Sequence, residues 1–211
     1  MMDEKIDVLD EHGEKTGRIV WRSEAHRKGL WHRCFHCWIF SPETELGGPR
    51  LFVQRRASGK ETWPDRLDVT VGGHLGAGEE PLDGLREVEE ELGLDVEPNE
   101  LIILGIRRAE LQIPAGLDRE FQDVFLLARN LTPDDLCLQE EEVASVVSLR
   151  LADTEALCGG AAVRAEEWTD GERRSVEINL ADFVPGEDGY LPRVAYAARA
   201  VLAGELPEVI F

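Results

Sequence analysis

The order of predicted elements places this chain in the α/β class. Short apolar segments typical of strands stand before and after one amphipathic helix at 81–92, and a second helical pattern follows near the end. Strands on both sides of a central helix favour helices packed in layers against a sheet. With 211 residues, of which 43% are hydrophobic, the chain suits one domain with peripheral additions.

Apolar runs bounded by turn residues predict the strands. The expected strands, in chain order, are Ile6–Leu9, Gly17–Trp21, Cys34–Phe40, Leu51–Gln54, Leu67–Val71, Leu101–Arg107, Phe121–Ala128 and Val143–Leu149. After Leu151 we expect a short helix, a turn-rich acidic segment through Gly189, and a helix over Pro192–Leu202. A single domain, 1–211, would then comprise N-terminal strands (1–31), a core (32–150) and a C-terminal helical extension (151–211).

The charge balance limits the classes of partner. The formal net charge is −20, from 43 acidic and 23 basic residues. Non-specific binding to nucleic acid or to an anionic membrane needs a basic face, so neither partner is expected. A small anionic substrate stays possible, because a local basic cluster and a metal ion can reverse the field inside a pocket. The sequence shows neither a transmembrane segment nor a signal-peptide core, and we expect a cytoplasmic protein.

The pair Cys34 and Cys37 raises the question of a metal or redox motif. Zinc would need two further ligands at a suitable spacing, and the sequence has no second C-x-x-C. The pair also lies inside a predicted strand, where residues three apart point to opposite faces. We therefore expect reduced, packed cysteines.

The most informative segment is a glycine-rich loop, 72–79, that leads into an acidic helix. At about 100° per residue, Glu87, Glu90 and Glu91 lie on one face of that helix. Like charges at this spacing cost roughly 0.2–0.5 kcal/mol per pair, and a divalent cation is the simplest compensation. A solvated acidic face would be the ordinary alternative.

The rest of the helix favours the functional interpretation. Leu85, Val88 and Leu92 form an opposite apolar stripe that would dock on a core. Pro81 suits the first turn, and Gly93 suits the left-handed residue after the last turn.

The segment resembles the Nudix box, G-x5-E-x7-R-E-U-x-E-E-x-G-U, where U is a bulky aliphatic residue. The second half is complete from Arg86 to Leu94, and Gly73 and Glu79 fit the first half. Only six residues separate Glu79 from Arg86, where the pattern has seven. Counting seven residues back from Arg86 would place Gly72 at the glycine position and Gly78 at the glutamate position, so the glutamate would be lost. The resemblance implies a Nudix-like α/β/α sandwich with a mixed β-sheet and additional terminal elements.

The resemblance also implies the chemistry. Members of the superfamily cleave a diphosphate linkage with Mg²⁺ or Mn²⁺. Here Glu87, Glu90 and Glu91 would hold the metal, with the Gly73 carbonyl as a further ligand. Glu87 would act as the base or bridge two metals, and Arg86 would orient it by a charge-assisted hydrogen bond.

Residues before the box are similar to isopentenyl-diphosphate isomerases and the hydrolases related to them. In that branch, histidines at the positions of His32 and His74, and one close to His26, bind a second metal with acids from a later strand. Glu120 and Asp123 are the candidate acids, and strand alternation places them on opposite faces, so at most one of the two would point inward, with Glu120 preferred. A histidine in a strand is more often structural, and that alternative stays open here.

The same resemblance, which covers roughly Ile6 to Leu149, assigns basic residues to the diphosphate. Arg56 and Lys60 match the positions that bind it in the isomerases. The isomerases carry a catalytic cysteine where this chain has Gly72, and this difference favours hydrolysis.

Three questions stay open at this point. The substrate could be a nucleoside diphosphate derivative or a related small organic diphosphate. Isomerase-like activity and a non-catalytic sensor of diphosphates or nucleotides are the alternatives. A homodimer could form through the apolar face of the last helix, or that face could pack on its own domain; the face comprises Val194, Ala197, Ala198, Val201 and Leu202.

Overall fold

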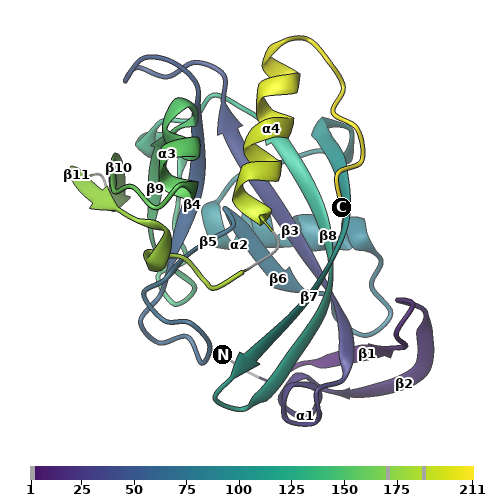
Figure 1. Ribbon diagram of the computed structural model, residues 1–211. Helices are drawn as coiled ribbons and strands as arrows, with labels where there is room; N and C mark the ends of the chain where they lie inside the picture. Colours follow the sequence, from purple (N-terminus) through teal and green to yellow (C-terminus); the bar gives the residue numbers. More distant parts are fainter. Residues whose placement is uncertain (1–2, 170–171, 187–188) are drawn as a thin grey trace.

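A computed structural model describes residues 3–169, 172–186 and 189–211 (Figure 1). The other residues of the predicted N-terminal and acidic segments, 1–2, 170–171 and 187–188, lie outside the described residues. The predicted α/β class is confirmed: a mixed sheet carries helices on both faces. In the described part of the chain, no helix is long and apolar enough to cross a membrane.

All strands belong to one hydrogen-bonded sheet. They are β1 (Lys5–Leu9), β2 (Lys15–Trp21), β3 (Trp31–Ser41), β4 (Arg50–Arg56), β5 (Leu67–Asp68), β6 (Val71–His74), β7 (Leu101–Ile113), β8 (Gly116–Ala128), β9 (Val143–Arg150), β10 (Val163–Thr169) and β11 (Glu172–Ile178). The main order is β11-β10-β9-β4-β3-β1-β2, and β6 and β8 also pair with β3. The β3–β8 pair is parallel and the other pairs of strands are antiparallel, which makes the sheet mixed.

The helices are short except for the last. They are α1 (Arg22–Lys28), α2 (Arg86–Leu92), α3 (Thr154–Cys158) and α4 (Tyr190–Leu202). Strand β3 separates two cores, because its side chains alternate between the faces. Phe35, Cys37 and Ile39 join the core beneath α2, and Trp38 and Phe40 join the core beneath α4.

Two predictions after residue 151 were wrong: the turn-rich acidic segment and the helical character of the C-terminal extension. The hairpin β10–β11 lies where the turn-rich segment was expected, so the extension contains strands as well as helices. The charged residues of this hairpin obscure its alternation, in which Val163 and Ala165 are buried on either side of the exposed Arg164. Glu167 continues the buried face, where Arg55, Arg174 and Ser145 bind its carboxylate.

The apolar face of α4 packs on its own domain. Val194, Ala197 and Ala198 are fully buried in the core beneath the helix, and Val201 packs at its margin. Most of this face is therefore not available for a dimer contact, and only Leu202 of the five predicted residues is exposed, at 40%. Of the two alternatives left open by the sequence, the structure shows internal packing.

Helix α1 was not predicted, because seven residues are too few for a periodic apolar pattern. It ends at Gly29, which adopts a left-handed conformation with φ of 61°. The helix matters for function because it carries the buried side chain of His26.

Candidate functional site

A cavity of about 850 Å³ lies against α2, β6 and the even-numbered side chains of β3. It contains most of the residues that the sequence singled out. Those that line it are His26, Arg56, Lys60, Gly73, His74, Arg86, Glu87, Glu90, Glu91 and Glu120. His32 lies directly behind this wall with no exposed surface.

Strand β6 brings the glycine loop against the acidic helix. A Cβ atom on Gly73 would lie 2.3 Å from the Glu87 carboxyl carbon, so only glycine allows this approach. The segment directly before α2 rests on the sheet at Gly84, where a Cβ would lie 2.4 Å from Phe35. Two glycines therefore fix how closely the helix and its carboxylates approach the cavity floor.

The expected continuous helix at 81–92 is divided at residue 86. Pro81–Leu85 form a 3₁₀ helix, and the α-helix begins at Arg86. A 3₁₀ helix rises about 2.0 Å per residue against about 1.5 Å for an α-helix, so five residues gain about 2.5 Å. This gain exceeds the rise of one helical residue, so the 3₁₀ turn spans more length than the same five residues would in an α-helix.

Arg86 ties the loop to the helix. Its guanidinium donates to both oxygens of Glu79 at 3.1 Å, to the His74 carbonyl at 3.1 Å, and to Glu87. Its distance to Glu90 is 3.6 Å. These contacts agree with the register that places Glu79 in the box, and they give the acidic helix face a fixed positive neighbour.

The three helix carboxylates differ in exposure. Glu91 is 3% exposed and accepts a hydrogen bond from Gln54 Nε2 at 3.2 Å, whereas the Glu90 side chain is 56% exposed. Burial, together with the nearby Glu87, raises the pKa of Glu91 to about 8. Burial also raises the pKa of Glu87, although Arg86 opposes that shift.

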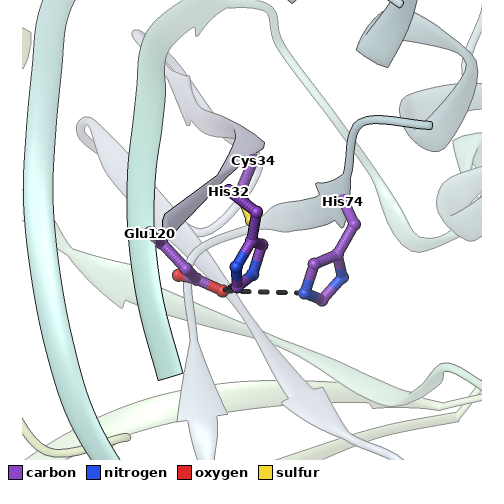
Figure 2. Close-up of side chains that lie close together, drawn as sticks. All are labelled: His32, Cys34, His74 and Glu120. Atoms are coloured by element: carbon purple, nitrogen blue, oxygen red, sulfur yellow. Dashed lines mark ion pairs between the residues drawn. The ribbon is translucent and has the colours of Figure 1, made fainter. Parts of the chain in front are cut away.

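A second group of ligand-type atoms lies on the other side of β6 (Figure 2). The rings of His26, His32 and His74 have centroids 5.2–5.4 Å apart, and they come from α1, β3 and β6. Glu120 on β8 faces them, with its Oε1 3.8 Å from His74 Nε2 and 4.0 Å from His32 Nε2. We call these four residues, with Asp118, the histidine cluster.

Asp118 is the member that sequence reasoning missed. Its Oδ1 lies 3.4 Å from His32 Nε2 and 3.5 Å from His26 Nε2. It stands two residues before Glu120 on the same strand face, so the alternation that selected Glu120 could also have found it. Asp123 points to the opposite face, as predicted, where it binds Arg33 at 2.6 and 2.9 Å.

The histidine cluster has the unsatisfied atoms that a cation would need. The Nε2 atoms of His26, His32 and His74, and Oδ1 of Asp118, are buried without a hydrogen-bond partner. Such atoms are rare in proteins, and each one calls for an explanation such as an ion. Burial lowers the pKa of His26 to about 4 and that of His74 well below its usual value, so the imidazoles are neutral and able to bind a metal.

Cys34 also lies in this region. Its side chain lines the cavity and shares the strand face of His32, and its backbone pairs with that of His74. Burial and the nearby acids raise the pKa of this thiol well above its usual value. The prediction of reduced, buried cysteines is correct for Cys34 and Cys37, but the sequence did not indicate that Cys34 would face the site.

The two predicted diphosphate-binding residues line the cavity and already contact acids. Arg56 binds Asp68 at 3.0 Å and the Thr62 carbonyl at 3.1 Å. Lys60 pairs with Glu142. A phosphate ligand would therefore have to share these cations with carboxylates.

Comparison with known proteins is consistent with this geometry. Residues 19–170 match the family model described as the NUDIX domain, which covers more than half of the chain. The chain belongs to the Nudix family. A Clostridium acetobutylicum protein named a Nudix hydrolase is 36% identical over 199 residues, which are 90% of this chain and 94% of the relative.

Other similarities agree on the family and the fold. Nudix hydrolase 3 of Arabidopsis thaliana is 36% identical over 69% of this chain, which spans 19% of that longer protein. An isopentenyl-diphosphate Δ-isomerase of Kocuria rhizophila is 27% identical over 84% of this chain and 95% of its own. The crystal structure of DR0079 from Deinococcus radiodurans shares the fold, with a TM-score of 0.51 and 23% identity over 74% of this chain and 90% of that one. The predicted Nudix-like α/β/α fold and hydrolase family are therefore confirmed.

Proposed function

We propose that this Nudix hydrolase cleaves the diphosphate linkage of a nucleoside diphosphate derivative or a related small organic diphosphate, using Mg²⁺ or Mn²⁺. Enzymes of this family use divalent metal cations. The observation that carries the proposal is the buried carboxylate of Glu91 together with the partly buried carboxylate of Glu87, which approaches Gly73 at the wall of a large cavity. Buried carboxylates of this kind are stable in the charged form only with a cation nearby.

Each residue of the box would have a separate task. Glu90, Glu91 and Glu87, with the Gly73 carbonyl, would hold the cation. When bound, the cation neutralises phosphoryl oxygens and lowers the pKa of a coordinated water. Glu87 would accept the proton from that water, because its carboxylate lines the cavity beside Gly73. Arg86 would hold the Glu87 carboxylate in position.

The histidine cluster would hold a second divalent cation. His26, His32, His74 and Glu120 form the set suggested by the family resemblance, and Asp118 completes it on the basis of its position. The imidazole nitrogens favour a transition metal such as Mn²⁺ over Mg²⁺. Because residues of both groups, among them Glu87 and His74, line one cavity, both sites would be open to the same bound diphosphate.

Arg56 and Lys60 would bind the phosphate groups away from the cations. Both side chains face the cavity and are largely buried, so their charges are weakly screened there. Substrate phosphates would compete with Asp68 and Glu142 for them.

Isomerase activity is the alternative function, and it can be tested directly. Gly72 replaces the catalytic cysteine of the isomerases, but the Cys34 thiol lines the same cavity. The raised pKa of this thiol makes it a poor base at neutral pH. Incubation of a prenyl diphosphate with the enzyme, followed by analysis for double-bond migration, would distinguish the two activities.

A screen of organic diphosphates with Mg²⁺ or Mn²⁺, with identification of both products, tests the hydrolase proposal. Glu87→Gln and Glu90→Gln should each reduce kcat at least about 100-fold, because each removes a charge from the metal site. The matched control is Glu89→Gln, an exposed residue of the same helix that does not line the cavity. Full activity in both variants would refute the assignment.

A further inference from the structure

His36 lines the cavity but belongs to neither candidate metal site. It lies on the even-numbered face of β3, which lines the cavity, and not on the face that packs beneath α2. Its partners in register on the neighbouring strands are Gly72 of β6 and Val124 of β8. Because neither partner carries a polar side chain, His36 is the hydrogen-bonding group of this row of the sheet.

Helix α4 holds the Nδ1 edge of the His36 ring. The hydroxyl of Tyr190, the first residue of that helix, lies 2.9 Å from Nδ1. The rings of Trp38 and Phe211 meet the Tyr190 ring edge-on, with centroids 5.2 and 5.3 Å away. An imidazole held in this way is preorganised, since little side-chain entropy remains to be lost when a ligand binds to it.

Arg107 favours the Tyr190 hydroxyl as the donor of this hydrogen bond. The Arg107 guanidinium lies 4.2 Å from the centroid of the Tyr190 ring. Its positive charge polarises the phenol, which makes the hydroxyl a better donor and a poorer acceptor. Burial lowers the pKa of His36, so the ring is neutral and carries one proton. With Nδ1 accepting from Tyr190, that proton lies on Nε2.

The opposite edge of the His36 ring faces Gly72. A Cβ atom on Gly72 would lie 3.4 Å from both Cδ2 and Nε2 of His36, so a side chain at this position would crowd the edge. In the described part of the chain, the hydrogen bond at Nδ1 is the only one that the ring makes. His36 keeps 9% of its surface exposed. The glycine therefore leaves an N–H donor facing the cavity.

The surroundings leave this donor for a ligand. The two acids that act electrostatically on His36 accept hydrogen bonds elsewhere, Glu120 from Gln122 and Asp68 from Arg56. A phosphoryl oxygen only accepts hydrogen bonds, and bonds from N–H groups to charged oxygens belong to the stronger class.

Strand β6 places the donor beside both candidate metal sites. Gly73, the residue after Gly72, approaches Glu87, and His74 belongs to the histidine cluster. A diphosphate that reaches both sites would therefore pass along β6, next to the Nε2 edge of His36.

We propose that His36 binds a phosphoryl oxygen of the substrate through its Nε2–H, and that Tyr190 is the positioning residue that holds Nδ1. The inference rests on the proposed function, because the phosphoryl groups must lie along β6. His36 differs from Arg56 and Lys60 in being uncharged and in making no ion pair with an acid. It can therefore fix the orientation of a phosphoryl group without competition from a carboxylate.

Two substitutions of His36 separate its two nitrogen positions. The amide nitrogen of glutamine reaches the position of Nε2, whereas that of asparagine reaches only the position of Nδ1. We would measure Kd by calorimetry, at saturating Mg²⁺, for methylenediphosphonate, whose P–C–P bridge is not hydrolysed. His36→Asn should weaken binding at least about ten-fold, and His36→Gln should stay within about three-fold of the wild type.

The control is Cys37→Ala, a change at the next residue of β3, which is fully buried on the opposite face. It should leave the Kd within about two-fold, because it is not in contact with the ligand. Equal losses in His36→Asn and His36→Gln, or no loss in either, would overturn the inference.

The role of Tyr190 has a spectroscopic readout. The nitrogen NMR chemical shifts of the His36 ring report which nitrogen carries the proton, and we expect Nε2 in the wild type. Tyr190→Phe should move the proton in part to Nδ1 and weaken binding by about two- to ten-fold. A wild-type ring protonated at Nδ1 alone, before and after addition of methylenediphosphonate, would contradict the inference, and this measurement needs no variant to fold.

Hydrolysis of small organic diphosphates is measured with the same proteins. Hydrolysis by the wild type together with unchanged Kd in both His36 variants would refute the inference and leave the proposed function supported. Selective loss of binding in His36→Asn without hydrolysis by the wild type would have the opposite meaning. A wild-type protein that does not bind methylenediphosphonate would overturn the inference whatever it hydrolyses.

Discussion

The box helix, α2, and the histidine cluster lie on either side of the four-residue strand β6, and they balance charge differently. At the helix, Arg86 contacts Glu79 and Glu87 and lies near Glu90, so part of the negative charge is already compensated. At the histidine cluster, three imidazole nitrogens and one carboxylate oxygen are buried without any hydrogen-bond partner. A cation at the helix would therefore complete an existing ion-pair network. A cation at the histidine cluster would instead satisfy atoms that have no hydrogen-bond partner.

A ligand change at the histidine cluster should give the largest effect. His32→Asn should lower the affinity for Mn²⁺ at least about 100-fold, because loss of even an outer-shell partner costs 10–100-fold. The measurement is metal titration by calorimetry, with metal content checked after dialysis. His12→Asn is the matched control, since this histidine is exposed. Unchanged affinity for Mn²⁺ in His32→Asn would show that the cluster does not bind the metal.

A methyl group at Gly73 should affect the helix side of β6 instead. Gly73→Ala places a Cβ against the Glu87 carboxyl group, and we expect about 1–3 kcal/mol of destabilisation with at least ten-fold lower kcat. Denaturant unfolding and steady-state assays would measure the two effects. In Gly76→Ala the new atom would lie at an ordinary 3.4 Å from Glu79, so this variant is the control. Equal behaviour of the two variants would argue against a tight Gly73–Glu87 contact.

The pH dependence of stability should have opposite signs for the buried carboxyl groups and for the buried imidazoles. For metal-free protein, Glu91 has a pKa raised from 4.5 to about 8, so its contribution is present below pH 4.5 and is lost as pH rises to 8. His26 has a pKa lowered from 6.5 to about 4, so its contribution is present above pH 6.5 and is lost as pH falls to 4. Between pH 6.5 and 8 the losses from Glu91 and from Asp118, whose pKa burial raises from 3.8 to about 8, should both operate.

Chemical denaturation of metal-free protein across this range would sharpen the comparison. At about 1.36 kcal/mol per pKa unit, Glu91 should lower the free energy of unfolding by about 2 kcal/mol between pH 6.5 and 8, and Asp118 should add to this fall. Glu91→Gln should remove the contribution of Glu91, and saturating Mg²⁺ should oppose the fall, because a cation favours the ionised carboxylate. A wild-type profile that stays flat or rises above pH 6.5 would contradict the raised pKa of Glu91.

Local patterns were sufficient for much of the fold. The strand runs and the 3.6-residue periodicity predicted the α/β class and the box helix. They failed for α1, which is only seven residues long, and for β10–β11, whose buried face includes the paired acid Glu167. Hydrophobic periodicity is hard to detect in a helix of only two turns. It is also interrupted where a buried strand face includes a charged residue whose ion-pair partners are distant in the sequence.

The acidic helix, its apolar stripe and the glycine that lets Glu87 approach β6 could be predicted from the sequence, since they depend on residues close together in the chain. The contacts between side chains of different elements could be seen only in the tertiary structure. Helix α1 and strands β3, β6 and β8 bring the histidine cluster together, with Asp118 as an added member, and the C-terminal extension brings Tyr190 to His36. Helical and strand periodicities fix the faces of single elements, whereas contacts between distant elements depend on how the sheet and its two cores pack.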